Sequence, residues 1–218
     1  PTTGLYLISL VNGERTFSYW RNNSAAKLLA QSSDDLESAM KDQDIIYFSG
    51  ITLAILDATS RENLFSSLKL ARHAGTKIAF DPNIRPKLWT DRNEMCEVIM
   101  AGANLSDIIL PSFEDEAVWF SDTDPNSTLD RYRNAGAETI VVKNAGKPIS
   151  FFSEQEMGIH NIKAIEKIVD STAAGDSFNS EILVGLLRKI PINDAINNGV
   201  NLAKKVIVGK GALVPSNV

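Results

Sequence analysis

Short apolar segments alternate with amphipathic helical segments from Asp44 onward, and this alternation restricts the chain to few folds. Each apolar segment ends at a glycine or a polar residue, and each helical segment leads into the next apolar one. Such alternation indicates a parallel sheet with helices on both faces, so the predicted fold class is α/β. The predicted strands are Ile45–Phe48, Lys77–Phe80, Asp107–Leu110 and Thr139–Val142, and the predicted helices are 61–74, 92–101, 114–120 and 129–134.

Two regions depart from this alternation. Near the start, Leu5–Leu10 and Arg15–Trp20 flank Asn12-Gly13, which is the strongest short-range signal for a β-hairpin. A two-stranded ribbon is marginally stable alone, so we expect it to lie on another element or to pair with further strands. After Val142, short antiparallel strands are predicted at 149–152 and 158–168, followed by helices at 176–189 and 192–209.

Polar and glycine residues follow the predicted strands at their carboxyl ends. In an open α/β sheet, ligands bind beyond this edge. The residues concerned are Gly50, Asp81, Asn83, Arg85, Ser112, Asp115 and Lys143. Their shared position predicts that they converge on one site.

The tract Asp170–Asn179 places small residues and an acid at the start of a helix. Phe178, Ile182 and later apolar residues recur at helical spacing directly after it. First-turn N–H groups are unpaired and lie at the positive end of the helix dipole, so they can hold a phosphate-like anion. Taken alone, the tract fits a plain N-cap better than an anion site, because Asp and Ser commonly precede apolar helices.

The segment Asp81-Pro82-Asn83-Ile84-Arg85 directly follows a predicted strand. Pro82 keeps Asp81 extended, so Asn83 and Arg85 are held outside the sheet edge. An arginine there suits carboxylate or phosphate through its planar set of donors. The competing interpretation is an Asx turn followed by a solvated arginine.

Composition excludes several classes of protein. A net charge of -5 argues against a nucleic-acid surface, and no apolar run approaches the length of a membrane span. Cys96 is the single cysteine, so no intramolecular disulfide or cysteine metal cluster can form, as is typical of the cytoplasm. The expected partner is a small molecule or another protein.

The tract Asp170–Phe178 resembles the C-terminal signature of the ribokinase-like (PfkB) carbohydrate kinases, in which a small-residue anion hole precedes a catalytic Asp. Asp81–Trp89, with Gly4–Tyr6 and Tyr19–Arg21, is similar to the branch of that family that phosphorylates 2-keto-3-deoxygluconate. The resemblance covers nearly the whole chain. It implies a ribokinase-like, Rossmann-like parallel sheet, with 1–24 as a partial β-lid and 25–218 as the kinase core.

The resemblance also implies roles for single residues. Asp176 would be the base facing the substrate hydroxyl, and the backbone of Ala173, Ala174, Gly175 and Asp176 would hold charge on the transferring phosphoryl group. This division agrees with phosphoryl transfer, which needs mainly positioning and charge stabilisation. The implied sugar-acid contacts are Tyr6, Tyr19, Arg21, Arg85 and Asp176, and the implied nucleotide contacts are Asn83, Arg85, Lys143, Gly146, Thr172 and Gly175.

ATP and Mg²⁺ are the cofactors that the resemblance implies, with a monovalent cation as a further one. The family's Asn-x-x-Glu segment, linked to Mg²⁺ through water, corresponds here to Ser112–Asp115, or to a segment one residue later, so Asp115 or Glu116 would take that role. The usual Lys-x-Gly-x-x-Gly nucleotide loop is altered to Lys143–Pro148, and the first anion-hole glycine is Ala173.

The chain also begins later than family members do, which have a strand, part of the lid and a Gly-Gly sugar-binding segment before the Gly-Leu-Tyr stretch. We therefore expect the N-terminal part to be missing, the fragment to be inactive by itself if that part is essential, and the full-length form to be a cytoplasmic homo-oligomer. Two alternatives stay open at this point. One is another kinase of the same fold, such as a fructokinase, and the other is a non-catalytic protein that binds a sugar or a nucleotide.

Overall fold

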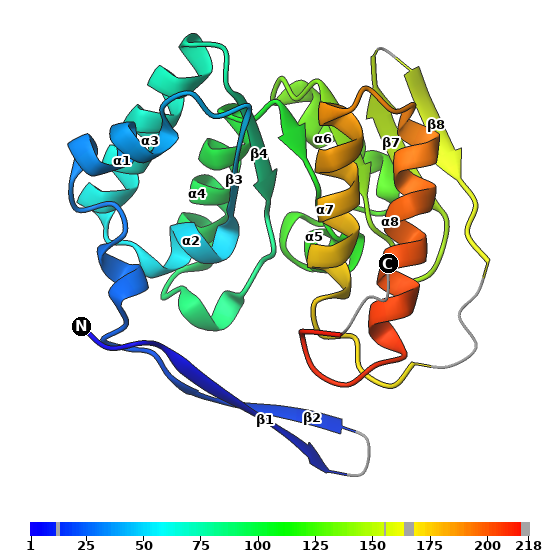
Figure 1. Cartoon of the computed structure of the whole chain (residues 1–218), viewed down its shortest axis with the longest axis horizontal. Coiled ribbons are helices and arrows are strands. Elements are labelled where there is room, and N and C mark those ends of the chain that lie inside the picture. The colour runs from blue at the N-terminus through cyan, green and yellow to red at the C-terminus, as the bar shows by residue number, and fades with distance from the viewer. Residues whose placement is uncertain (12–13, 155, 164–167, 215–218) are drawn as a thin grey trace.

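The computed structural model describes residues 1–11, 14–154, 156–163 and 168–214, and within them six strands form one central sheet (Figure 1). The strands follow chain order across the sheet; β3 to β6 are parallel, and β7 and β8 continue it in antiparallel fashion. The short 143–148 connection explains the change, because a parallel neighbour needs a long crossover. The bounds are β3 Ile45–Ser49, β4 Lys77–Asp81, β5 Ile108–Ile109, β6 Thr139–Val142, β7 Ile149–Ser153 and β8 Glu156–His160.

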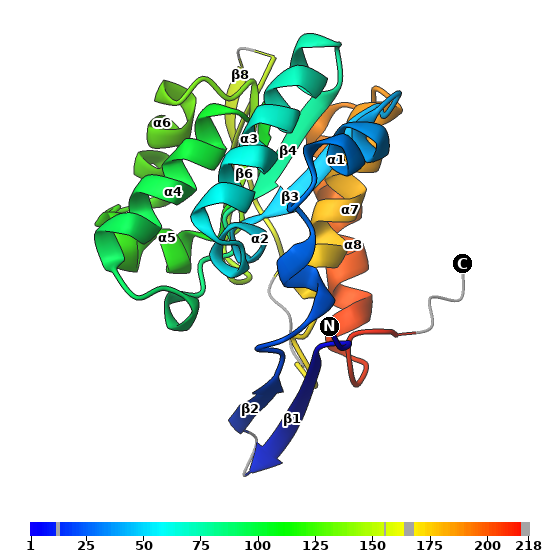
Figure 2. The same ribbon diagram turned by 90° about the vertical axis from the view of Figure 1, so that its left-hand side faces the viewer.

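Helices cover both faces of this sheet (Figures 1 and 2). Successive residues of β4 point to opposite faces, so Phe80 joins the apolar cluster under α1 to α6 and Ala79 joins the cluster under α7 and α8. The predicted α/β class is confirmed. The bounds are α1 Ser33–Met40, α2 Gly50–Ile55, α3 Ala58–His73, α4 Arg92–Asn104, α5 Phe113–Phe120, α6 Pro125–Asn134, α7 Ala174–Leu187 and α8 Ile192–Ile207, with short 3₁₀ turns η1 Ala25–Leu28 and η2 Pro86–Leu88.

The strands β1 (Leu5–Val11) and β2 (Glu14–Trp20) form a separate antiparallel ribbon. It projects from the body on the side where the parallel strands end (Figure 1). Tyr6 pairs with Tyr19 across the ribbon, and Leu5 pairs with Trp20, a residue that is 58% exposed. The predicted Asn12-Gly13 turn lies outside the described residues.

The largest differences from the sequence-based prediction are one strand end, one helix start and two missed helices. The strand predicted at 158–168 is β8, which spans Glu156–His160; residues 161–163 are not in a strand, and 164–167 lie outside the described residues. Helix α6 starts at Pro125, where Asp124 caps it, rather than at Leu129. The helices α1 and α2 were not predicted, because α1 buries only Leu36 and α2 is a six-residue apolar run that directly follows β3.

None of the helices in the described ranges combines the length and the apolar content that a membrane-spanning segment needs.

Candidate active site

Helix α7 begins at the small-residue tract that the sequence singled out. Its N-cap is Ala173, whose backbone is left-handed at φ 61°, a region that glycine enters at lower cost than alanine. The Ala174 N–H donates to the Ser171 carbonyl, whereas in the described part of the chain no acceptor meets the N–H groups of Gly175 and Asp176. These two donors lie at the positive end of the helix dipole and are available to an anion.

A buried polar cluster lies beneath this helix start. The Lys143 ammonium donates to Asp81 Oδ2 and to Asn179 Oδ1, both at 3.1 Å. The Asn179 amide donates to Asp81 Oδ2 at 2.7 Å and to the Tyr47 hydroxyl at 3.2 Å. Burial, and then the charge of Asp81, raises the pKa of Tyr47 well above its usual value, with a smaller contribution from Asp176. The cluster therefore holds two opposite charges out of water and joins α7 to the sheet.

The sheet delivers these residues to one place. Asp81 is the last residue of β4 and pairs with Ser49 at the end of β3, while Lys143 follows β6 and bridges to Ser112 after β5. Gly50 lets the chain pass close to β4, because a Cβ there would stand 1.9 Å from the Pro82 carbonyl oxygen. The predicted convergence at the carboxyl edge is thus present for Asp81, Ser112 and Lys143.

Arg85 and Asp115 meet at the same edge. Arg85 Nη1 lies 3.6 Å from Asp115 Oδ2, and both side chains are partly exposed. Burial raises the pKa of Asp115, while the charge of Arg85 opposes the rise. Glu116 points elsewhere: its carboxylate accepts from Arg131 at 2.7 Å and Tyr132 at 2.9 Å, and it has no exposure to solvent. Of the two acids, Asp115 is the one that a ligand at this edge could reach.

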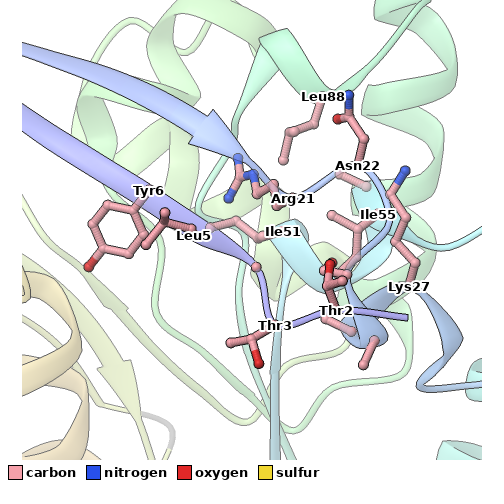
Figure 3. Close-up of a pocket in the computed structure, with 15 residues that line it drawn as sticks. Thr2, Thr3, Leu5, Tyr6, Arg21, Asn22, Lys27, Ile51, Ile55 and Leu88 are labelled. Carbon is pink, nitrogen blue, oxygen red and sulfur yellow. The ribbon is translucent and has the colours of Figure 1, made fainter.

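The ribbon residues surround a different space. A cavity of about 560 Å³ lies between the ribbon and the body, with Tyr6 and Arg21 on the ribbon side and Ile51, Ile55 and Leu88 on the body side (Figure 3). The Arg21 guanidinium lies 4.2 Å from the centre of the Tyr19 ring, a distance typical of a cation–π contact. In the described ranges no hydrogen bond or ion pair joins Arg21 to Asp176.

The remaining predicted residues take separate places. Asn83 has a positive φ of 33°, and its N–H donates to Asp81 Oδ1, so the Asp81–Asn83 segment is an Asx turn. The Thr172 N–H donates to Asp170 Oδ1 just before α7. Gly146 has a φ of 83° and lies exposed in the turn between β6 and β7. Thr172 thus lies beside the helix start, and Gly146 lies past Lys143 on the loop.

Two residues of the buried cluster were not predicted. Asn179 follows Asp176 by one helical turn, and this spacing is the signal that could have found it. Tyr47 lies inside β3, among apolar residues, and no local pattern distinguishes it.

The described residues contain no group of three or more His, Cys, Asp and Glu side chains arranged to bind a metal ion. Mg²⁺ in kinase sites usually keeps several waters and is bound by one or two carboxylates together with substrate phosphates.

A family model described as pfkB family carbohydrate kinase matches residues 1–217. The 2-dehydro-3-deoxygluconokinase of Haemophilus influenzae is 38% identical over 97% of this chain and 69% of the relative, and that of Escherichia coli K12 is 37% identical over 97% and 71%.

Solved structures agree with the fold. The PfkB protein from Polaromonas sp. JS666 superposes with a TM-score of 0.82 at 26% identity, covering 95% of this chain and 67% of that one. An Escherichia coli protein described as a ribokinase II, in complex with ATP and Mg²⁺, superposes with a TM-score of 0.79 at 21% identity, covering 94% of this chain and 65% of that one.

Proposed function

The chain belongs to the pfkB family of carbohydrate kinases, and from this premise we propose that it phosphorylates the sugar acid 2-keto-3-deoxygluconate, also called 2-dehydro-3-deoxygluconate, with ATP. The observation that carries the proposal is the 38% identity to a kinase named for this substrate, over 97% of the chain. The chemistry of the candidate site supports it, because unpaired helix N–H groups and an adjacent carboxylate are what phosphoryl transfer to a hydroxyl requires.

Asp176 is the proposed base. As the substrate hydroxyl attacks the γ-phosphorus of ATP, its oxygen forms the new P–O bond, its proton passes to the Asp176 carboxylate, and ADP leaves. The N–H groups of Gly175 and Asp176, with Ala173 and Ala174 shaping the turn, stabilise the negative charge on the phosphoryl oxygens. The left-handed Ala173 supports this role, because local backbone strain is often retained at functional sites.

The ribbon supplies the proposed grip on the sugar acid. Arg21 carries the charge that a carboxylate needs, Tyr19 holds its guanidinium in place, and Tyr6 borders the same cavity. Figure 1 shows the ribbon and the start of α7 on one side of the body, and in this proposal the sugar acid binds between them. In this proposal residues 1–24 act as a β-lid over a kinase core formed by 25–218, and Arg85 contacts the substrate or the phosphates from the core.

The proposed nucleotide contacts are Asn83, Arg85, Gly146, Thr172 and Gly175. Asp115 would hold Mg²⁺ through water, since its carboxylate is partly exposed beside Arg85, whereas Glu116 is fully buried against Arg131. Bound Mg²⁺ would neutralise charge on the phosphates. A monovalent cation is a further proposed cofactor.

The test is a coupled assay of the 218-residue chain with ATP and Mg²⁺ on 2-keto-3-deoxygluconate, gluconate, fructose and ribose, with and without K⁺. We expect turnover on the keto-deoxy acid above that on the neutral sugars. Preference for fructose would favour a fructokinase, and ATP binding without turnover on any sugar would favour a non-catalytic protein.

A further inference from the structure

The side-chain amide of Asn179 uses both of its N–H donors and its carbonyl oxygen in hydrogen bonds. Its oxygen accepts from Lys143, and its nitrogen donates to Asp81 and Tyr47. Only 2% of its surface is exposed, and the same is true of Asp81. These bonds link α7 to β3, to β4 and to the residue that follows β6.

The charges around this amide fix its orientation. A flipped amide would place its NH₂ group against the Lys143 ammonium and its oxygen against the Asp81 carboxylate, so two attractive bonds would become two repulsive contacts. The cluster therefore allows one arrangement of Asn179 relative to the sheet.

This arrangement matters for Asp176, which precedes Asn179 by one turn on the same helix. The apolar contacts of α7, such as that of Phe178 with Gly199, hold the helix against α8, but apolar packing alone is not directional. Hydrogen bonds are directional, so the bonds of Asn179 set both the rotation and the height of the first turn of α7. The Lys143 ammonium also lies beneath Gly175, 3.9 Å from where a Cβ would stand.

We propose that Asn179 and Lys143, tied together by Asp81, are positioning residues that hold the Gly175–Asp176 turn in its reactive orientation. The proposal rests on the role proposed above for Asp176. It assigns Lys143 to this cluster rather than to the nucleotide, because its ammonium is bound on two sides and its side chain is only 13% exposed.

The test compares Asn179→Ala, Lys143→Met and the double variant with the unchanged chain, at a temperature where circular dichroism shows each to be folded. Matched controls are Asn63→Ala, which removes a helix asparagine bonded to the Ala30 carbonyl, and Lys77→Met, which removes an exposed lysine paired with Glu138. Two quantities are measured: kcat and KM for ATP, and hydrogen exchange of the peptide that covers residues 174–180.

A positioning role predicts that kcat falls roughly 10- to 100-fold in each single variant while KM for ATP stays within about threefold. The double variant loses little more than either single one, because both changes break one cluster. Hydrogen exchange at 174–180 increases in both single variants, whereas exchange in α3 stays as it is in the unchanged chain. A general loss of stability would raise exchange in both segments.

Three results would overturn the inference. A tenfold rise in KM for ATP at unchanged kcat in Lys143→Met would make Lys143 a nucleotide contact. Unchanged kcat in the Asn179 and Lys143 variants would remove the positioning role, and so would unchanged exchange at 174–180. If the unchanged chain itself has no kinase activity, the proposed function fails, and the exchange measurement alone still decides whether the cluster holds the α7 turn.

Discussion

A Cβ added to Gly175 would stand 3.9 Å from the Lys143 ammonium nitrogen, an ordinary van der Waals distance. Packing therefore does not require glycine at this position, whereas the proposed anion hole would, because a phosphate must approach the backbone closely. We expect Gly175→Ala to keep its stability, or to gain up to about 1 kcal/mol in free energy of unfolding, since alanine is the better helix former. Turnover should fall roughly 10- to 100-fold.

Gly50→Ala serves as the comparison, and we expect it to lower stability rather than turnover. Its Cβ would stand 1.9 Å from the Pro82 carbonyl oxygen, so backbone must move, at a cost on the order of 1–3 kcal/mol in free energy of unfolding. Urea denaturation and the kinase assay on both variants separate the two reasons for glycine. Full turnover in Gly175→Ala would contradict the anion-hole assignment.

Asp176→Asn should lower kcat by roughly 100- to 10,000-fold, because an amide cannot take the proton of the substrate hydroxyl. The change is nearly isosteric and lies on an exposed first turn, so the free energy of unfolding should change little. Asp194→Asn, in the first turn of the neighbouring α8, is the matched control and should retain full activity. Equal turnover in the two variants would show that the base lies elsewhere.

Arg21→Ala should weaken binding of the acid sugar by about 1.5–3 kcal/mol, the range for a hydrogen bond to a charged group. A neutral sugar has no carboxylate for Arg21 to bind, so its KM should stay the same. Lys27→Ala removes another cation at the same cavity and should affect both sugars equally. An equal rise of KM for both sugars in Arg21→Ala would argue against carboxylate recognition by this residue.

The sequence was sufficient to predict the sheet and the sheet edge at which the candidate site lies. Parallel strands that alternate with helices must end at a common edge, so the positions of Asp81, Arg85 and Lys143 after their strands already placed them near one another. The start of α7 was predictable for a similar reason, because small residues followed by helical periodicity indicate a helix N-terminus.

Side-chain partners could not be predicted in the same way. Asp115 and Glu116 are neighbours in sequence, yet one faces Arg85 at the sheet edge and the other is buried against Arg131, because successive residues of a helix point in different directions. Which acid faces the site depends on how α5 is rotated, and that is set by packing far away in the sequence. The partnership of Lys143 with Asn179 likewise joins residues 36 positions apart.

The buried position of Glu116 has a consequence for stability. Burial raises the pKa of its carboxyl group to about 7, although the Arg131 guanidinium and the Tyr132 hydroxyl act in the opposite direction. Because the folded state binds this proton more tightly than the unfolded state, Glu116 contributes most to stability below about pH 4.5. That contribution decreases as the pH rises, and it is lost once the pH has passed the folded pKa.

Glu116→Gln removes the titration while keeping the size and most hydrogen-bonding capacity of the side chain. Between pH 5 and pH 8, we expect the free energy of unfolding of the unchanged chain to fall relative to that of Glu116→Gln by roughly 2–3 kcal/mol, at 1.36 kcal/mol per pKa unit. Urea denaturation at the two pH values measures this difference. Glu138→Gln, an exposed glutamate paired with Lys77, is the control and should follow the pH dependence of the unchanged chain. If the free energy of unfolding of Glu116→Gln has the same pH dependence as that of the unchanged chain, the carboxyl group of Glu116 is ionised throughout this range. The Arg131 contact then outweighs the cost of burial.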